Sequence, residues 1–199
     1  MFEIAEYVGT IAFTMSGFFV AVRNKLDLLG ILIATFLTAL GGGIIRDIAV
    51  DRVPYTFSHD YPAIIVLSLL ILLIVFKFHK KESVENKPLF IVSDSVGLVS
   101  FSITGALIAI ESGFNLTGVL AMSFITAVGG GIVRDIIINE VPFVFKTGFY
   151  GTVALLMGLL VFILNQMGNI SFASLSLLFF LGVTIRVVAY YKRWKVPII

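Results

Sequence analysis

The sequence contains no cysteine and only two histidines, His59 and His79, among its 199 residues. Without cysteine the chain can form no disulfide, no thiolate nucleophile and no cysteine-based metal site. Both histidines lie in polar connections and have no partner at ligand spacing, so we expect no zinc site. No Asp or His constellation has catalytic spacing either. We therefore expect no enzymatic activity, no bound cofactor and no nucleic-acid partner.

Charge is also scarce, because only 13% of the residues are charged, whereas a soluble domain carries roughly a quarter. Hydrophobic residues make up 59% of the chain. A bilayer core of about 30 Å needs about 20 apolar residues in a helix, and this length divides the chain into seven spans. The sequence therefore predicts an all-α polytopic membrane protein with spans near residues 4–22, 29–50, 61–78, 90–110, 117–138, 147–165 and 171–190.

The basic residues gather on one side of this predicted arrangement. The opposite side carries little basic charge beyond Arg52, whereas the basic side holds Arg23, Lys25, Lys77, Lys80, Lys81, Lys87, Lys146, Lys192, Arg193 and Lys195. Cytoplasmic loops are enriched in lysine and arginine, so we expect a multi-pass protein of the cell membrane with its N-terminus outside and its C-terminus in the cytoplasm. Membrane lipids are expected partners, and Arg186 with the tail at 190–195 could bind anionic lipid, although snorkelling and topology anchoring also explain them.

The chain repeats itself at an offset of 88 residues. Identical residues recur at this offset through the first two spans of the repeat and the connection that follows them, as in the pairs Gly9 and Gly97, Phe13 and Phe101, and Pro54 and Pro142. We therefore expect a first three-helix repeat at 1–80, a second at 81–166, and a seventh transmembrane helix with a basic tail at 167–199. Because three spans is an odd number, the second repeat must enter the membrane from the opposite side. This predicts an inverted 3+3 repeat plus one helix, an architecture typical of membrane transport.

Each repeat carries a glycine triplet inside an apolar run, in the segments TALGGGIIRDIAVDRVP and TAVGGGIVRDIIINEVP. A mid-helix glycine is less favourable than alanine by about 1 kcal/mol, so three together should make the helix kink or open. Both triplets fall near the bilayer midplane, where freed carbonyls must face protein or water. We expect them to line a central polar cavity, with close packing as the alternative. The glycines are Gly41, Gly42, Gly43, Gly129, Gly130 and Gly131.

An Arg-Asp pair follows each triplet by one helical turn: Arg46 with Asp47, and Arg134 with Asp135. Ionisable groups at membrane depth suggest function, so we expect one pair at each mouth of a pathway, where it could gate. A structural ion pair that anchors the helix ends is the alternative. Hydroxyl groups could line the same path or bond back to helix carbonyls, and the candidates are Ser16, Thr38, Thr104 and Thr126.

The doubled signature GGGIIRD and GGGIVRD, in a 3+3+1 chain of 199 residues, resembles the prokaryotic branch of the trimeric intracellular cation (TRIC) channels. The resemblance covers nearly the whole chain. It implies a homotrimer in which each protomer has its own pore for monovalent cations, chiefly potassium. By this resemblance the second and fifth helices line the pore and bend at the triplets. Potassium would then meet the backbone carbonyls of Gly41, Gly42, Gly129 and Gly130, as carbonyl dipoles replace hydration in other cation pores.

A small-solute transporter is the alternative function, because the same family has also been described as a glycine-type transporter. Inverted repeats and broken helices suit alternating access as well as a pore. Two features favour a passive pore: the halves are nearly symmetric, and no unpaired carboxylate is expected near the midplane.

Overall fold

The computed structural model describes residues 2–78, 87–146 and 149–194, and these segments contain nine α-helices and no strand. The predicted repeat boundary at 80 and 81, together with His79, Lys80, Lys81 and Lys195, lies outside the described residues. The helices are α1 (Phe2–Arg23), α2 (Leu28–Ala49), α3 (Tyr55–Ser58), α4 (Tyr61–Val75), α5 (Lys87–Glu111), α6 (Leu116–Ile137), α7 (Phe143–Lys146), α8 (Tyr150–Gln166) and α9 (Phe172–Tyr191).

A long helix lies at each of the seven predicted spans, and the sequence did not predict the two short helices α3 and α7. Five helices, α1, α2, α5, α6 and α9, are long and apolar enough to cross a membrane. The apolar helices α4 and α8 are shorter, with 15 and 17 residues. The all-helical prediction is confirmed for the described residues, and five helices meet the length of a membrane span.

Equivalent helices of the two halves begin in the same way. The Asp27 carboxylate accepts a hydrogen bond from the backbone N–H of Gly30 at 2.7 Å, and the Asn115 amide oxygen accepts one from Gly118 at 3.0 Å. Each cap satisfies one of the free N–H groups of a helix start. Since these pairs are also 88 residues apart, α2 and α6 begin at the same point of the repeat.

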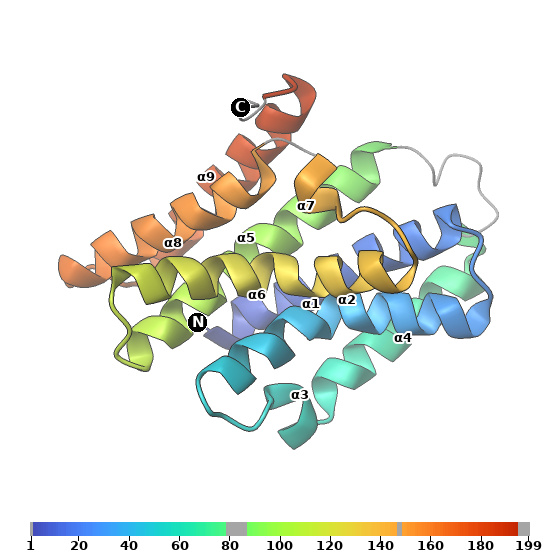
Figure 1. Ribbon diagram of the computed structural model, residues 1–199, viewed down its shortest axis with the longest axis horizontal. Coiled ribbons are helices and arrows are strands. Elements are labelled where there is room, and N and C mark those ends of the chain that lie inside the picture. The colour runs from blue at the N-terminus through green and yellow to red at the C-terminus, as the bar shows by residue number, and fades with distance from the viewer. Residues whose placement is uncertain (1, 79–86, 147–148, 195–199) are drawn as a thin grey trace.

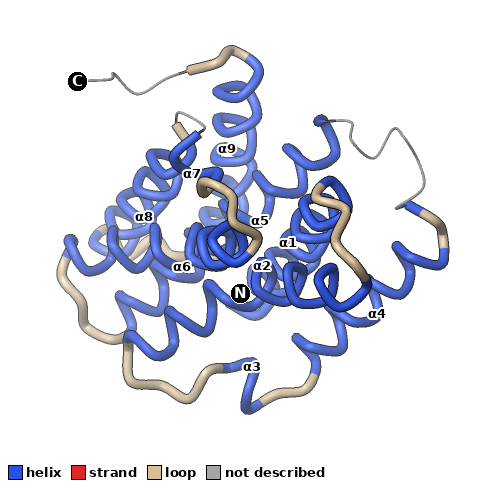
Figure 2. Tube along the Cα trace, turned by 45° about the vertical axis from the view of Figure 1, so that its right-hand side comes forward, coloured by secondary structure: helices blue, strands red, loops and turns tan. Residues whose placement is uncertain are grey.

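Four helices form the centre of the bundle. The α1 helix packs against α5 and α2, while α6 packs against α2 and α5. Figure 1 shows α2 and α6 side by side in the middle, with α4 on one flank and α8 and α9 on the other, and Figure 2 shows the same order after rotation. The α9 helix lies outside the repeat and contacts α5 and α8.

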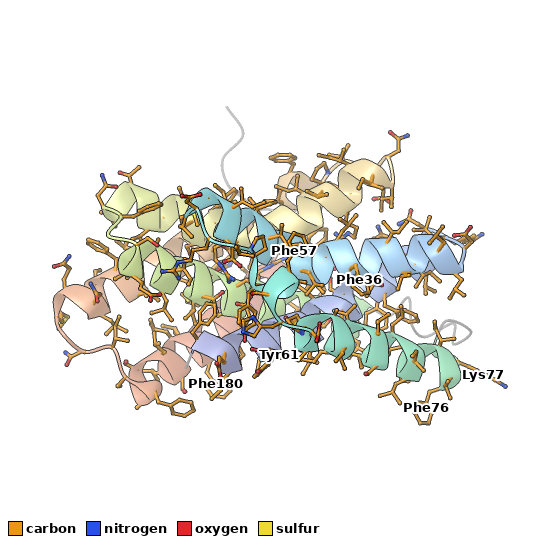
Figure 3. The ribbon with its side chains drawn as sticks, turned by 90° about the horizontal axis from the view of Figure 1, so that it is seen from below. Phe36, Phe57, Tyr61, Phe76, Lys77 and Phe180 are labelled. Atoms are coloured by element: carbon orange, nitrogen blue, oxygen red, sulfur yellow. The ribbon has the colours of Figure 1, made fainter. Side chains whose placement is uncertain are left out.

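The surface of the bundle is apolar, and its interior is rich in polar side chains. Phe57, Phe76 and Phe180 project from the outside of the helices in Figure 3 and are 70%, 64% and 67% exposed. In contrast, hydroxyl and charged side chains of all four central helices are buried. Exposed apolar side chains around buried polar ones are the distribution expected where lipid surrounds the protein.

Reciprocal contacts relate the two halves by an approximate two-fold axis. A Cβ at Gly9 would lie 3.2 Å from the ring of Phe101, and a Cβ at Gly97 would overlap the ring of Phe13. These contacts exchange under the 88-residue offset, and the two phenylalanine rings pack together with centroids 5.3 Å apart. Gly9 contacts the equivalent of Phe13, and Phe13 contacts the equivalent of Gly9. Such an exchange of contacts places a two-fold axis where α1 and α5 meet.

Candidate functional site: a polar core between the repeats

The glycine triplets lie where α2 and α6 cross with their backbones in contact. A Cβ on Gly41 would lie 3.1 Å from the Cα atom of Gly130, and one on Gly42 would overlap the carbonyl oxygen of Thr126. The reciprocal Cβ on Gly130 would lie 2.7 Å from the carbonyl oxygen of Thr38. Real Cβ atoms do not approach backbone this closely, so this crossing requires glycine on both helices.

Of the two expected effects of the triplets, a kink or an opening of the helix, opening does not occur. Both α2 and α6 remain α-helical through Gly41–Gly43 and Gly129–Gly131, and their carbonyls therefore stay within helical hydrogen-bond geometry. The physical reason is tertiary packing, since the helix–helix contact that glycine permits compensates its low helix propensity. Close packing of two helices, the alternative role of the triplets, describes the α2–α6 crossing.

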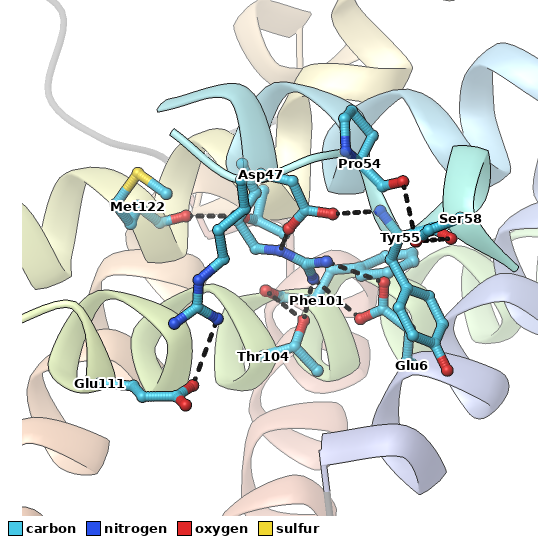
Figure 4. A network of polar contacts seen from close by, with 12 residues as sticks. Glu6, Asp47, Pro54, Tyr55, Ser58, Phe101, Thr104, Glu111 and Met122 are labelled. Carbon is cyan, nitrogen blue, oxygen red and sulfur yellow. Dashed lines mark hydrogen bonds and ion pairs between the residues drawn. The ribbon is translucent and has the colours of Figure 1, made fainter. Parts of the chain in front are cut away.

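Arg46 forms the centre of the first charged cluster, whose members Glu6, Asp47 and Thr104 lie close together in Figure 4. Its Nε atom donates to the Oδ1 atom of Asp47 at 2.8 Å, and its Nη1 and Nη2 atoms donate to the two carboxylate oxygens of Glu6 at 2.8 and 3.2 Å. Nη1 also donates to the Thr104 hydroxyl at 3.3 Å. The guanidinium is 0% exposed and lies 5.1 Å from the centre of the Phe2 ring. Two carboxylates thus surround one arginine, leaving a formal charge of −1.

Arg134 forms the equivalent cluster in the second half. Its Nε and Nη2 atoms lie 2.8 and 2.7 Å from the Oδ1 atom of Asp135, and its Nη1 atom donates to the Thr38 hydroxyl at 3.4 Å. Arg134 is 2% exposed. Both Arg-Asp pairs are buried rather than exposed at the surface, and the second pair borders a cavity at one end of the bundle. Each is covered by the helices that pack on it.

Each aspartate of the two pairs also fixes the chain that follows its helix. The Oδ2 atom of Asp47 accepts from the backbone N–H of Tyr55 at 2.8 Å, and that of Asp135 accepts from Phe143 at 2.7 Å. Tyr55 and Phe143 are the first residues of α3 and α7. A carboxylate on a free N–H at a helix start is favourable, so the Arg-Asp pair anchors the turn between two helices. An ion pair that anchors the helix ends, the alternative to a gating pair, describes these contacts and is compatible with a further role.

The four hydroxyl candidates all lie inside the core and divide into two groups. Thr38 and Thr126 bond back to helix carbonyls at 2.7 and 2.6 Å. Thr104 bonds back at 3.3 Å and accepts from Arg46, whereas Ser16 donates across the repeats to the Oδ1 atom of Asp94 at 3.0 Å. Thr38, Thr104 and Ser16 therefore contact charged residues of the core.

Two adjoining cavities connect the second cluster to one end of the bundle. The outer cavity has about 240 Å³ and is lined by Arg23, Arg134, Asp135, Glu140 and Lys146 among others. The inner cavity shares Arg134 and Asp135 with it and reaches Thr38, Asp94, Gly131 and Tyr150. The volume of the inner cavity is about 10 Å³, and one water molecule needs a cavity of about 10–15 Å³. The path thus contains charged and polar groups and narrows beside Gly131 to about the size of one water molecule.

A third and larger cavity, of about 380 Å³, is unsuited to ions. It lies between α1, α5 and α9 and is lined almost entirely by apolar side chains, including Ile4, Val8, Leu107 and Phe180. An ion there would lose its hydration without any compensating ligand. The polar core is therefore the candidate functional site.

Exposed ion pairs connect the loops at both ends of the bundle. Arg23 pairs with Glu140 at 3.3 Å at one end, and Arg52 pairs with Glu111 at 3.4 Å at the other. Arg23 and Glu111 occupy equivalent positions 88 residues apart, as do Arg52 and Glu140, so the two pairs are symmetry mates with exchanged charges. Partial burial acts to raise the pKa of Glu140, but a hydrogen bond from Lys146 and the charge of Arg23 hold the pKa below its ordinary value.

Sequence reasoning missed four residues of the polar core: Glu6, Asp94, Tyr150 and Arg186. Glu6 and Asp94 are also 88 residues apart, a signal that shows in the charge of the two side chains and not in residue identity. Asp94 is buried near the start of α5 and forms no ion pair within the described segments, and the expectation about carboxylates near the midplane did not cover this position. Arg186 is 1% exposed, so its expected availability to lipid is also corrected.

An apolar-surfaced helical bundle, whose two related halves enclose a buried charged core, defines an integral membrane protein of the transport type. The chain belongs to the family whose model is described as "Glycine transporter", which matches residues 3–80 and 91–166. Among its relatives, the UPF0126 membrane protein YvgT of Bacillus subtilis is 38% identical over 195 residues, which is 98% of this chain and 95% of YvgT. The UPF0126 inner membrane protein YadS of Escherichia coli K12 is 32% identical over 77% of this chain and 74% of its own.

Solved structures of TRIC channels match the fold along the whole chain. A prokaryotic TRIC channel crystallised in 0.5 M KCl superposes with a TM-score of 0.88 and 28% identity, covering 98% of each chain. A TRIC cation channel described for the structural basis of its conductance has a TM-score of 0.85 and 33% identity, covering 100% of this chain and 97% of its own. The trimeric orthologue from Rhodobacter sphaeroides has a TM-score of 0.85 and 27% identity, covering 96% of this chain and 97% of its own. The resemblance to prokaryotic TRIC channels is confirmed, and these relatives are membrane proteins and channels rather than enzymes.

Proposed function

We propose that this protein is a monovalent cation channel, conducting mainly potassium, with one pore per protomer of a homotrimer. The observation that carries the proposal is the buried polar core, in which charged and hydroxyl side chains of α1, α2, α5 and α6 meet around the α2–α6 crossing. The likeness of the whole chain to TRIC cation channels supports the same function.

The proposed topology has seven membrane crossings, with the N-terminus outside and the C-terminus in the cytoplasm. The short helices α4 and α8 complete the crossings together with the polar turns that flank them. Antiparallel courses of α2 and α6 in Figure 1 support an inverted repeat. The Arg23–Glu140 and Arg52–Glu111 pairs support it too, because each joins a loop of one repeat to the same-side loop of the other.

Cation preference follows from how the arginines of the core are paired. Arg46 contacts two carboxylates, those of Glu6 and Asp47, and Arg134 contacts that of Asp135. Their positive charges are thereby balanced, and the first cluster keeps a net negative charge. A narrow path with this charge favours a cation over chloride.

The proposed constriction is the crossing of the two glycine triplets. Glycine leaves the carbonyl oxygens of Gly41, Gly42, Gly129 and Gly130 uncovered by side chains, and a carbonyl in a helix retains a second lone pair. A small separation of α2 and α6 would let a potassium ion reach these oxygens. The narrow inner cavity of about 10 Å³ is consistent with a channel at rest.

Transport of a small solute such as glycine is the second candidate, and Asp94 favours it. A buried carboxylate without an ion pair is typical of coupled transporters, where such a group binds a coupling ion or proton. The description of the family model as a glycine transporter points the same way. The two candidates share the core and differ in what moves through it.

Flux from liposomes distinguishes the candidates. Purified protein would be reconstituted, and the efflux of potassium, sodium, chloride and glycine would be compared with protein-free liposomes. We expect potassium efflux to exceed chloride efflux, and the oligomer to have the mass of a trimer by light scattering. Saturable glycine uptake without ionic current would favour the transporter, and chloride efflux above that of potassium would contradict cation preference.

A further inference from the structure

The two charged clusters are symmetry mates, yet they differ in one acidic residue. Glu6 on α1 and Asp94 on α5 occupy equivalent positions. The Glu6 carboxylate reaches Arg46 with both oxygens. Asp94 is one methylene shorter, and no ion pair joins it to Arg134 in the described segments. The Arg134 guanidinium instead donates to Asp135 and Thr38.

Asp94 is therefore left without its repeat partner. Its Oδ1 atom accepts from Ser16, and the carboxylate also interacts with the Tyr150 hydroxyl, but the buried Oδ2 atom has no hydrogen bond of good geometry among the described residues. An unbalanced carboxylate at this depth is unfavourable, and a nearby positive charge stabilises its ionised form. Asp94 also lines the inner cavity, where the proposed path is narrowest.

In addition to Arg134, a positive charge near Asp94 comes from α9, the helix that has no counterpart in the repeat. Arg186 is 1% exposed, and its guanidinium lies 4.8 Å from the centre of the Tyr150 ring and 5.8 Å from that of Tyr190. Its charge interacts with Asp94 and Tyr150, and both of these residues line the inner cavity. The Nε and Nη1 atoms have no hydrogen-bond partner within the described part of the chain. Arg186 thus lies behind the cavity wall and acts on it through Asp94 and Tyr150.

Formal charges then differ between the two halves. The first cluster, with Arg46, Glu6 and Asp47, has a sum of −1. The second cluster has two positive and two negative groups, Arg134, Arg186, Asp94 and Asp135, and a sum of zero. Without Arg186 the second sum would also be −1, so this residue of α9 is what makes the halves electrically unequal.

We propose that Arg186 is a positioning residue that balances Asp94 and thereby makes cation conduction asymmetric between the two directions. A cation meets a net negative cluster from one end and a neutral cluster from the other. Ion occupancy near the two clusters therefore differs, and current at equal and opposite voltages differs with it. The inference rests on the proposed cation channel, and it concerns direction rather than the existence of conduction.

The test is single-channel recording of the purified full chain in symmetric KCl of low concentration, where charge is least screened. The measured quantity is the larger current divided by the smaller at opposite voltages, so the orientation of insertion does not matter. In Arg186→Met this ratio should fall toward one, and the smaller current should rise about threefold to tenfold, tenfold corresponding to about 1.4 kcal/mol. Arg186→Lys should restore the wild-type ratio. Thr184→Val, at an exposed position of the same helix, is the matched control.

Asp94→Asn gives a second and opposite arm, because it leaves the second cluster with a charge of +1. The ratio should rise above that of the wild type, and the double variant Asp94→Asn, Arg186→Met, with a sum of zero, should return toward it. This arm carries the test if Arg186→Met does not assemble. The inference alone is overturned if the wild type conducts but the current ratio is unchanged in Asp94→Asn, or if the double variant does not restore the wild-type ratio. A wild type without cation current overturns the proposed function together with it.

Discussion

Exchange of single glycines for alanine separates a packing role of the triplets from simple helix weakening. At Gly42 the added methyl group would overlap the carbonyl oxygen of Thr126 on the facing helix. At Gly131 the nearest atom to the added methyl group is the Nη2 atom of Arg134 at 3.8 Å, an ordinary contact. Both positions are mid-helix, so both gain the same helix propensity.

The two substitutions should change stability in opposite directions. Alanine in place of a mid-helix glycine gains about 1 kcal/mol, and at Gly131 nothing opposes this gain. At Gly42 the helices must separate, and overpacking costs about 1–3 kcal/mol, the upper part applying because the obstacle is backbone. We expect Gly42→Ala to lose about 2 kcal/mol and Gly131→Ala to gain about 1 kcal/mol. At about 2–4 °C per kcal/mol for a chain of this size, Tm falls by roughly 4–8 °C in the first and rises by roughly 2–4 °C in the second.

Thermal unfolding of the purified protein in one detergent measures both values, with Gly130→Ala as the symmetry control for Gly42→Ala. Gly130 faces the carbonyls of Leu37 and Thr38, so its variant should match that of Gly42. An unchanged Tm in both Gly42→Ala and Gly130→Ala would refute backbone contact at the crossing. Equal destabilisation in Gly131→Ala would show that the triplets disfavour alanine for a reason other than packing.

Three further predictions concern the charged residues and the topology. Arg46→Met leaves the buried Glu6 and Asp47 carboxylates unbalanced and should cost about 3–5 kcal/mol, seen as a lower Tm and partly recovered when Glu6→Gln is added. Because the pKa of Glu140 is lowered in the folded protein, its contribution is present above the ordinary glutamate pKa of about 4.3 and is lost as the pH falls through the lowered value. Between pH 6 and pH 3 the Tm of Glu140→Gln should therefore change slightly less than that of the wild type. The difference corresponds to less than about 1 kcal/mol of unfolding free energy, because the ion pair is partly exposed. Val53→Cys should react with an impermeant thiol reagent from outside the cell and Val141→Cys only after permeabilisation, since both are exposed and they are symmetry mates; the reverse pattern would contradict the topology.

The sequence predicted the long helices closely, because apolar run length is a direct signal. Each predicted span overlaps a helix, and the α2 and α6 helices begin and end within one residue of the prediction. The short α3 and α7 helices were missed, because four residues are too few for a periodic pattern. Their positions depend on Asp47 and Asp135, whose partners are eight residues away and are fixed only by the fold.

The glycine triplets show where local propensity is insufficient. Propensity predicted a weak point at Gly41–Gly43, and the location was informative even though the helix stays intact. What stabilises the helix there is the backbone of α6, which no single-helix argument contains. Arg186 shows a related limit. Its position near a basic tail suggested a lipid-facing role, and only the packing of α9 on α5 and α8 places it against Asp94 and Tyr150.

The differences between the repeats carry information that the matches do not. Two copies of one unit related by a two-fold axis have no inherent direction, because each end of the axis is equivalent to the other. Direction has to come from residues that break the symmetry. Arg23 and Glu111 exchange sign at equivalent positions, which biases basic charge to one end of the bundle, and the proposed orientation follows from this bias. The shortening of Glu6 to Asp94 and the arrival of Arg186 from α9 break the symmetry in the core. Residues that are identical in the two halves therefore maintain the packing of α2 on α6. Residues that differ between the halves make one end of the protein different from the other.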